Sequence, residues 1–138
     1  MIQNNIWSTV KKQAREFNSV KGWETIGDKH CYFKSKAEVK CAYRLQTLKE
    51  MELISEWEYE PQVFYFEGIK RGCTNYTPDF KVILPNEKHF WIEVKGYMDA
   101  KSRTKINRFL KYFKEEDLLV IEKEKFLMIN IEIEKYSK

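Results

Sequence analysis

Hydrophobic residues recur along the chain at two spacings, and these spacings predict helices and strands. Helical spacing covers residues 5–18, 35–53 and 100–114. Alternating or continuous apolar and aromatic runs predict strands at 57–67, 76–84, 89–95, 118–122 and 126–134. Residues 21–30 and 68–75 contain glycines and are expected to be loops. The order predicts an α/β fold, a mixed β-sheet with helices packed on it.

The predicted helix at 100–114 has one apolar and one basic side. Its apolar residues fall at i, i+3, i+4 and i+7, and they form a core stripe of Ile106, Phe109, Leu110 and Phe113. The opposite side carries a basic ridge of Lys101, Lys105, Arg108 and Lys111. We therefore expect this helix to be held by its apolar side and to present the ridge outward.

The predicted strands 76–84 and 89–95 form a hairpin whose register decides where Asp79 points. Even-numbered residues of both strands are apolar or aromatic and should face the core, whereas Glu93 and Lys95 share the other face. A three-residue connection puts Asp79 opposite Glu93 or Lys95, whereas a two-residue connection would bury Asp79 among core residues. We predict the three-residue connection, with the Cβ atoms of the two acids roughly 5–8 Å apart.

Length and composition favour one soluble globular domain. The 138 residues suffice for a single core, and 43% hydrophobic with 33% charged residues excludes collagen-like and disordered chains. We expect one domain over 1–138, with 1–30 as an N-terminal helical extension. Apolar runs are too short to cross a membrane, and no secretory signal is evident. Three widely spaced cysteines fit reduced thiols, so we expect a cytoplasmic protein.

Charge is concentrated in one segment of the chain. The formal net charge is +4, but residues 95–114 carry +6 and residues 115–138 carry −3. A focused basic patch suits a polyanion such as a nucleic acid. On charge alone, a solvated helix face is the more common explanation.

Asp79 and Glu93 would be like charges in close proximity, and a divalent cation could compensate them. Oxygen ligands favour Mg²⁺, with Mn²⁺ as a substitute. Without further information, a solvated strand face neutralised by Lys95 is the simpler interpretation. Glu38 also has two interpretations. It could complete a capping box with Ser35, which the spacing favours. Alternatively, it could point inward from the apolar stripe of its helix, toward the same metal.

These residues form a recognisable pattern. Pro78-Asp79, thirteen further residues and Glu93-Val94-Lys95, with an upstream acid at Glu38, resemble the PD-(D/E)XK nuclease signature. Flanking stretches between Phe33 and Phe113 are similar to small phage-encoded endonucleases. Among these, Tyr76–Phe80 and Glu93–Gly96 resemble the phage junction-resolving endonucleases.

The resemblance implies a restriction-endonuclease-like core and a Mg²⁺-dependent DNA endonuclease. Asp79 and Glu93 would ligate the metal, Lys95 would assist the water nucleophile, and Glu38 would ligate directly or through water. Gln62 would be an accessory contact. From charge, not from the family, we expect phosphate contacts at Lys70, Arg71, Lys101, Arg103, Lys105 and Arg108. A phage-encoded protein would act in the host cytoplasm.

Several alternatives stay open at the level of sequence. We favour a structure-selective nuclease for branched DNA or Holliday junctions, because little chain remains for a target-recognition domain. A transposon-end or repair-type nicking nuclease and a non-catalytic DNA-binding module are the other candidates. Junction cutting would require a homodimer; Trp7 and Trp23 could supply its interface, although core packing is the commoner use of such side chains. A zinc site from His30, Cys31, Cys41, Cys73 and His89 lacks paired-ligand spacing.

Overall fold

A central mixed sheet with helices on both faces organises the protein. The computed structural model describes residues 22–137, so the helix expected at 5–18 and the side chain of Trp7 lie outside the described residues. The elements are β1 (Gly22–Ile26), β2 (Lys29–Phe33), α2 (Lys36–Glu50), β3 (Glu56–Tyr59), β4 (Phe64–Tyr65), β5 (Asn75–Tyr76), β6 (Phe80–Ile83), β7 (His89–Lys95), α3 (Ala100–Tyr112), β8 (Leu118–Glu122) and α4 (Leu127–Tyr136). The predicted mixed α/β architecture is confirmed.

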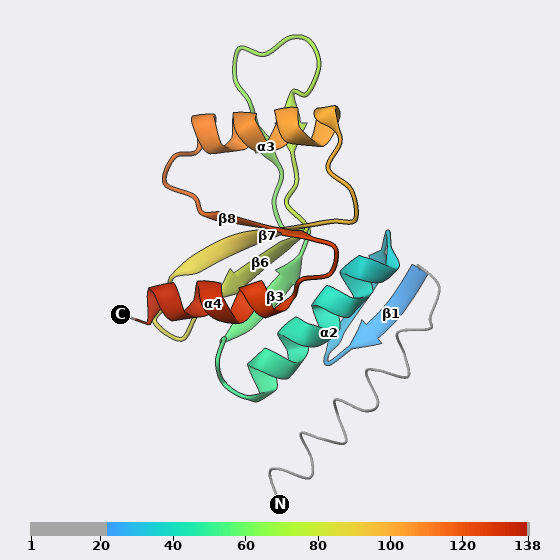
Figure 1. Ribbon diagram of the computed structural model, residues 1–138, viewed down its shortest axis with the longest axis vertical. Helices are drawn as coiled ribbons and strands as arrows, with labels where there is room; N and C mark the ends of the chain where they lie inside the picture. The colour runs from blue at the N-terminus through green and yellow to red at the C-terminus, as the bar shows by residue number, and fades with distance from the viewer. Residues whose placement is uncertain (1–21, 138) are drawn as a thin grey trace, which may run out of the picture.

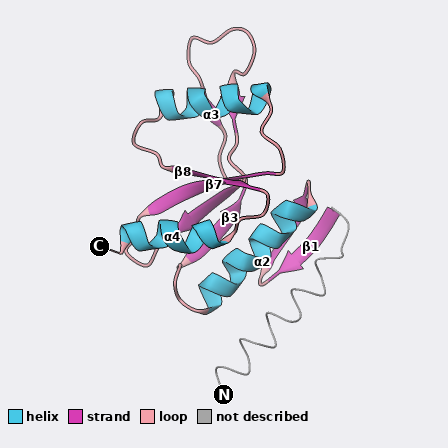
Figure 2. Ribbon diagram, in the orientation of Figure 1, coloured by secondary structure: helices cyan, strands magenta, loops and turns pink. Residues whose placement is uncertain are grey.

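The central sheet has the strand order β3-β6-β7-β8. Strands β3, β6 and β7 are antiparallel neighbours, and β8 runs parallel to β7 after the crossover through α3. Figure 1 shows α2 and α4 on one side of this sheet and α3 on the other. Two small antiparallel pairs, β1-β2 and β4-β5, lie outside it (Figure 2).

Two hydrophobic clusters cover the two faces of the sheet. The larger one packs α2, α4 and β2 against inward-facing residues of the sheet such as Phe80, Phe90 and Ile92. The smaller one is aromatic and lies on the α3 side. It consists of Phe64, Phe66, Tyr76, Trp91 and Phe109. No helix within residues 22–137 combines the length and apolar character needed to cross a bilayer.

Three strand and loop predictions were wrong at positions where the chain turns. Residues 21–30 were expected to be a loop, but residues 22–30 belong to the hairpin β1-β2, which turns at Gly27 with a φ of +62°. The single strand expected at 57–67 is split into β3 and β4, because Glu60 has a φ of +46° and Pro61 follows it. The strand expected at 76–84 is likewise split around Pro78, which has no N–H for a sheet ladder.

Two predictions near the C-terminus also need correction. The strand expected at 126–134 is helix α4: its isoleucines alternate with polar residues, but Ile129 and Ile133 also satisfy an i, i+4 spacing, and both are buried against the sheet. In α3, Leu110 is 44% exposed and does not belong to the core stripe, whereas Ile106 and Phe109 are buried.

Trp23 is 64% exposed, so it does not pack in the core of the described residues.

The predicted three-residue connection of the β6-β7 hairpin is confirmed, and the register is the one that puts Asp79 opposite Glu93. Phe80 pairs with Ile92 and Ile83 with His89, and the backbone N–H of Leu84 donates to the carbonyl of Lys88 at 2.8 Å. The connection is therefore the three residues 85–87. Glu87 adopts a φ of +71°, the left-handed conformation usual at the last position of a three-residue hairpin loop.

Candidate active site

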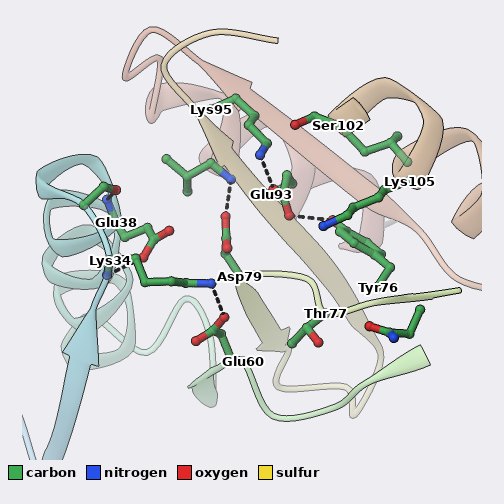
Figure 3. A pocket seen from close by; sticks show the side chains of 14 residues that line it. Lys34, Glu38, Glu60, Tyr76, Thr77, Asp79, Glu93, Lys95, Ser102 and Lys105 are labelled. Atoms are coloured by element: carbon green, nitrogen blue, oxygen red, sulfur yellow. Dashed lines mark hydrogen bonds and ion pairs between the residues drawn. The ribbon is translucent and has the colours of Figure 1, made fainter. Parts of the chain in front are cut away.

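A cavity of about 380 Å³ opens between the start of α2, β5, the end of β7 and α3. Its lining includes all four residues of the predicted catalytic set, which come from α2, from the segment just before β6 and from β7: Glu38, Asp79, Glu93 and Lys95. Figure 3 shows Asp79 and Glu93 side by side, with Glu38 entering from α2 and Lys95 from the end of β7. The structure thus brings together residues that are up to 57 positions apart in sequence.

Asp79 and Glu93 are buried, with 5% and 6% of their surface exposed. Asp79 directly precedes β6, and its Oδ2 accepts the backbone N–H of Val94 at 2.7 Å, where the ladder with β7 ends. Glu93 Oε2 lies 3.2 Å from the ammonium of Lys95. The interpretation of this trio as a solvated strand face is therefore wrong, because both carboxylates are withdrawn from water.

Only half of the capping box expected at Ser35 and Glu38 is present, and the carboxylate of Glu38 lies at the cavity instead. Ser35 caps α2 in the expected way, its Oγ accepting the Glu38 N–H at 3.1 Å. The Glu38 carboxylate does not return to the Ser35 N–H; instead, its Oε1 accepts the backbone N–H of Lys34 at 3.0 Å. Only 7% of Glu38 is exposed, and its side chain lines the cavity. The helix is capped, and the acid is still available to the site.

Two tyrosines hold these carboxylates, and the sequence analysis did not identify either of them. The hydroxyl of Tyr76 donates to Glu93 Oε1, and that of Tyr59 donates to Glu38 Oε1, each at 2.6 Å. Burial, followed by the charge of the neighbouring carboxylate and the hydrogen bond to it, raises the pKa of Tyr76 above its ordinary value. Burial, followed by the hydrogen bond to Glu38 and the charge of that carboxylate, likewise raises the pKa of Tyr59, so both phenols stay protonated as donors. Their aromatic character suggested core packing, and nothing in their spacing marked them as partners of acids.

The acids are short of compensating positive charge. Burial raises the pKa of Asp79 to about 8, and the charges of Glu93 and Glu38 add to this effect. Burial also raises the pKa of Glu93, although Tyr76 and Lys95 oppose it. Lys34, another cation of the lining, is paired with Glu60 at 2.6 Å. The ionised carboxylates would thus gain from a further cation.

The donor set fits a hard divalent cation. The acids offer only oxygen atoms, and Oδ1 of Asp79 and Oε2 of Glu38 accept no hydrogen bond from the described residues. In this arrangement, however, no three His, Cys, Asp or Glu side chains within residues 22–137 stand close enough together to form a metal-binding group. A metal ion held by all three acids would therefore require their side chains to move closer together than they are here.

Most of the remaining predicted contacts lie outside the cavity. Gln62 is exposed in the segment between β3 and β4, and Lys70, Arg71, Lys101 and Arg103 are exposed as well. Arg108 is half-buried and donates to the carbonyl of Cys73 at 2.6 Å, so it anchors the loop before β5 to α3. Lys105 lines the cavity. The ridge expected on α3 is thus divided between the cavity, the loop and the outer surface.

The residues considered for zinc are dispersed. Cys41 is fully buried in α2, Cys31 lies on β2, and Cys73 lies in the loop before β5. The ring of His89 contacts Glu116 at 2.8 Å, and His30 stacks on Trp23 with ring centroids 5.0 Å apart. They belong to different parts of the fold, and the three thiols are free.

Comparisons with known proteins give no match. Neither the family models, nor the curated proteins, nor the solved structures contain a significant relative of this chain.

Proposed function

We propose that this protein is a metal-dependent endonuclease that hydrolyses phosphodiester bonds in DNA. The observation that carries the proposal is the buried pair Asp79 and Glu93, one directly before β6 and the other on the neighbouring strand β7, with the Lys95 ammonium 3.2 Å from Glu93. Glu38 lines the same cavity. This is the arrangement that the PD-(D/E)XK resemblance implies for these positions, and a four-stranded mixed sheet flanked by helices is compatible with a restriction-endonuclease-like core.

Asp79, Glu93 and Glu38 would hold Mg²⁺ or Mn²⁺. When bound, such an ion polarises a phosphate oxygen and lowers the pKa of a bound water. The hydrogen bonds from Val94 N–H, Tyr76 and Tyr59 fix the orientation of the carboxylates before any ligand arrives. Lys95 supplies a fixed positive charge where negative charge develops on the phosphate during the reaction.

The substrate that we propose is branched or junction DNA, cut by a homodimer. The basic residues outside the cavity, Lys70, Arg71, Lys101 and Arg103, are exposed and can contact phosphates without base readout. A nicking nuclease of transposon ends or of repair is the second candidate within the same chemistry. A non-catalytic DNA-binding module is a third, but the withdrawal of two acids from water has no use in simple phosphate binding.

The test is cleavage of labelled four-way junction and linear duplex DNA with Mg²⁺, Mn²⁺ or EDTA. We expect divalent-dependent cleavage that Glu93→Gln lowers at least ~10³-fold, because the acid would ligate the metal at the reacting centre. The exposed Glu134→Gln is the matched control and should cleave like the wild type. If the wild type binds DNA but cleaves neither substrate with either metal, the protein is a binding module. Sedimentation of the protein with and without junction DNA tests the homodimer.

A further inference from the structure

The cavity has two chemically different walls. The acids Glu38, Asp79 and Glu93 line one wall, on α2 and the strands. The other wall consists of α3 and β5, and it contributes groups that can donate hydrogen bonds: Asn75, Ser102 and Lys105. Figure 3 shows Ser102 directed from α3 toward Lys95, and the ammonium of Lys105 directed toward Glu93 and Tyr76.

Lys105 differs from the other two lysines of the cavity. Lys34 is 2.6 Å from Glu60 and Lys95 is 3.2 Å from Glu93. Lys105 is half-buried, yet within residues 22–137 it has no carboxylate within 4 Å and no hydrogen-bond partner. Partial burial of an ammonium without a partner is unfavourable, so the position suits an anion supplied from outside the chain.

The position of Lys105 is fixed by its helix. Ile106 and Phe109 are buried, which orients α3 so that Ser102 and Lys105, one turn apart, both face the cavity. The backbone N–H of Ser102 already donates a hydrogen bond to the side chain of Asp99, the N-cap of α3, at 2.7 Å. The attraction for an anion therefore comes from the side chains and not from the free end of the helix.

We propose that Lys105, Ser102 and Asn75 form a phosphate subsite, which holds the phosphodiester of a nucleic-acid strand against the acidic wall. This inference rests on the proposed function and deepens it. An ammonium, a hydroxyl and a carboxamide can all donate to the non-bridging oxygens of a phosphate. With anionic substrate on this wall and the cation-binding acids on the other, the cavity separates substrate contacts from metal contacts. Lys105 is thereby set apart from the exposed cations of α3, which contact phosphates remote from the reacting one.

The test uses two measurements on Lys105→Ala and Lys105→Met; the methionine retains the apolar stem of the side chain. The first is binding of fluorescent junction DNA in EDTA over a series of salt concentrations, so that no metal or turnover is involved. Loss of one phosphate contact should weaken binding about tenfold and lower the salt slope by about one. The second is the single-turnover cleavage rate with Mg²⁺ at saturating DNA, which should fall at least ~10-fold because the reacting phosphate is misplaced.

The matched control is Lys88→Ala, which removes an exposed lysine from the β6-β7 turn outside the cavity. It should leave both measurements within about twofold of the wild type, as expected for a screened surface charge. Thermal melting of each variant checks the fold. If Lys105→Ala and Lys105→Met bind and cleave like Lys88→Ala while the wild type cleaves, the subsite is wrong and the nuclease proposal stands. If no protein cleaves but the Lys105 variants lose affinity and salt slope, the subsite stands and the nuclease proposal fails.

Discussion

The two faces of the central sheet are built from the same strands but have different roles. On the face toward α2 and α4, Phe80, Val82, Phe90 and Ile92 are completely excluded from water. On the opposite face, the aromatic cluster around Trp91 covers one part, and the strands leave Asp79 and Glu93 against an open cavity. Because side chains alternate along a strand, successive residues of β6 and β7 point in turn to the core on one side and to the aromatic cluster and the cavity on the other. Stability should therefore depend on the first face, and ionisable chemistry on the second.

The largest loss of stability is expected from Phe80→Ala, on the face toward α2 and α4. Phe80 is fully buried, and its ring lies against Phe33, Trp57 and Tyr59. Removing it leaves a cavity in the larger cluster and should lower the free energy of unfolding by about 3–5 kcal/mol. Urea denaturation measures this cost. A cost below about 1 kcal/mol would mean that the α2 face does not dominate the stability of the fold.

On the opposite face, a substitution should raise the free energy of unfolding instead of lowering it, because the buried carboxyl of Asp79 weakens the fold at neutral pH. The ordinary pKa of an aspartate, 3.8, is raised to about 8 for Asp79 in the folded protein. A carboxyl with a raised pKa holds its proton more tightly in the folded state. Without metal, its contribution to stability is complete below about pH 4 and is lost as the pH rises toward about 8.

Asp79→Asn removes this titration. In EDTA, the variant should be more stable than the wild type by about 1–3 kcal/mol at pH 8, with the difference vanishing near pH 4. The exposed Asp28→Asn in the β1-β2 turn is the control and should follow the wild type at both pH values. Equal stability of wild type and Asp79→Asn at pH 8 would show that the carboxylate is better compensated than its surroundings suggest.

A smaller effect is expected from the tyrosine that supports Glu93. Tyr76→Phe keeps the ring against Phe109 and removes only the hydroxyl that donates to Glu93. Loss of such a supporting hydrogen bond should weaken Mn²⁺ binding about 10–100-fold, measured by titration calorimetry. Tyr97→Phe, at a position 81% exposed, should bind Mn²⁺ like the wild type. If Tyr76→Phe bound Mn²⁺ as tightly as the wild type, the hydroxyl of Tyr76 would have no role in metal binding and its ring would serve only in packing.

The smallest effect is expected at Leu110, which the sequence pattern assigned to the core and the structure leaves 44% exposed. Leu110→Ala should change the free energy of unfolding by no more than about 0.5 kcal/mol. A loss above about 1.5 kcal/mol in urea denaturation would restore Leu110 to the core stripe of α3.

The sequence was sufficient for features that depend on local periodicity. Helices α2 and α3, strand β7 and the three-residue β6-β7 connection follow from alternating and helical spacing. The spacing left Asp79 opposite Glu93 or Lys95, and the structure has the register that puts it opposite Glu93. The convergence of Glu38 on the same cavity needed the resemblance, because spacing alone favoured simple capping. In α4, the isoleucines satisfy both a strand and a helix pattern, and only packing against the sheet decides between them.

Other features depend on contacts between distant segments and could not be inferred from spacing. Tyr59 and Tyr76 reach their acids from 21 and 17 residues away, and Arg108 reaches a carbonyl 35 residues away. The β1-β2 hairpin was missed because its exposed face carries the aromatic residues Trp23 and Tyr32, which weakens the usual contrast between an apolar inner face and a polar outer face.

The three-residue connection at 85–87 has a consequence for how this chain can vary. It lies at the far end of β6 and β7 from the cavity, yet its length determines on which side of the sheet Asp79 emerges. Insertions or deletions of one residue there would swap the core and cavity sides of a whole strand, whereas changes of two residues would preserve them. The length of this surface turn is therefore restricted although the turn lies outside the cavity. The lengths that it tolerates should differ from three residues by even numbers.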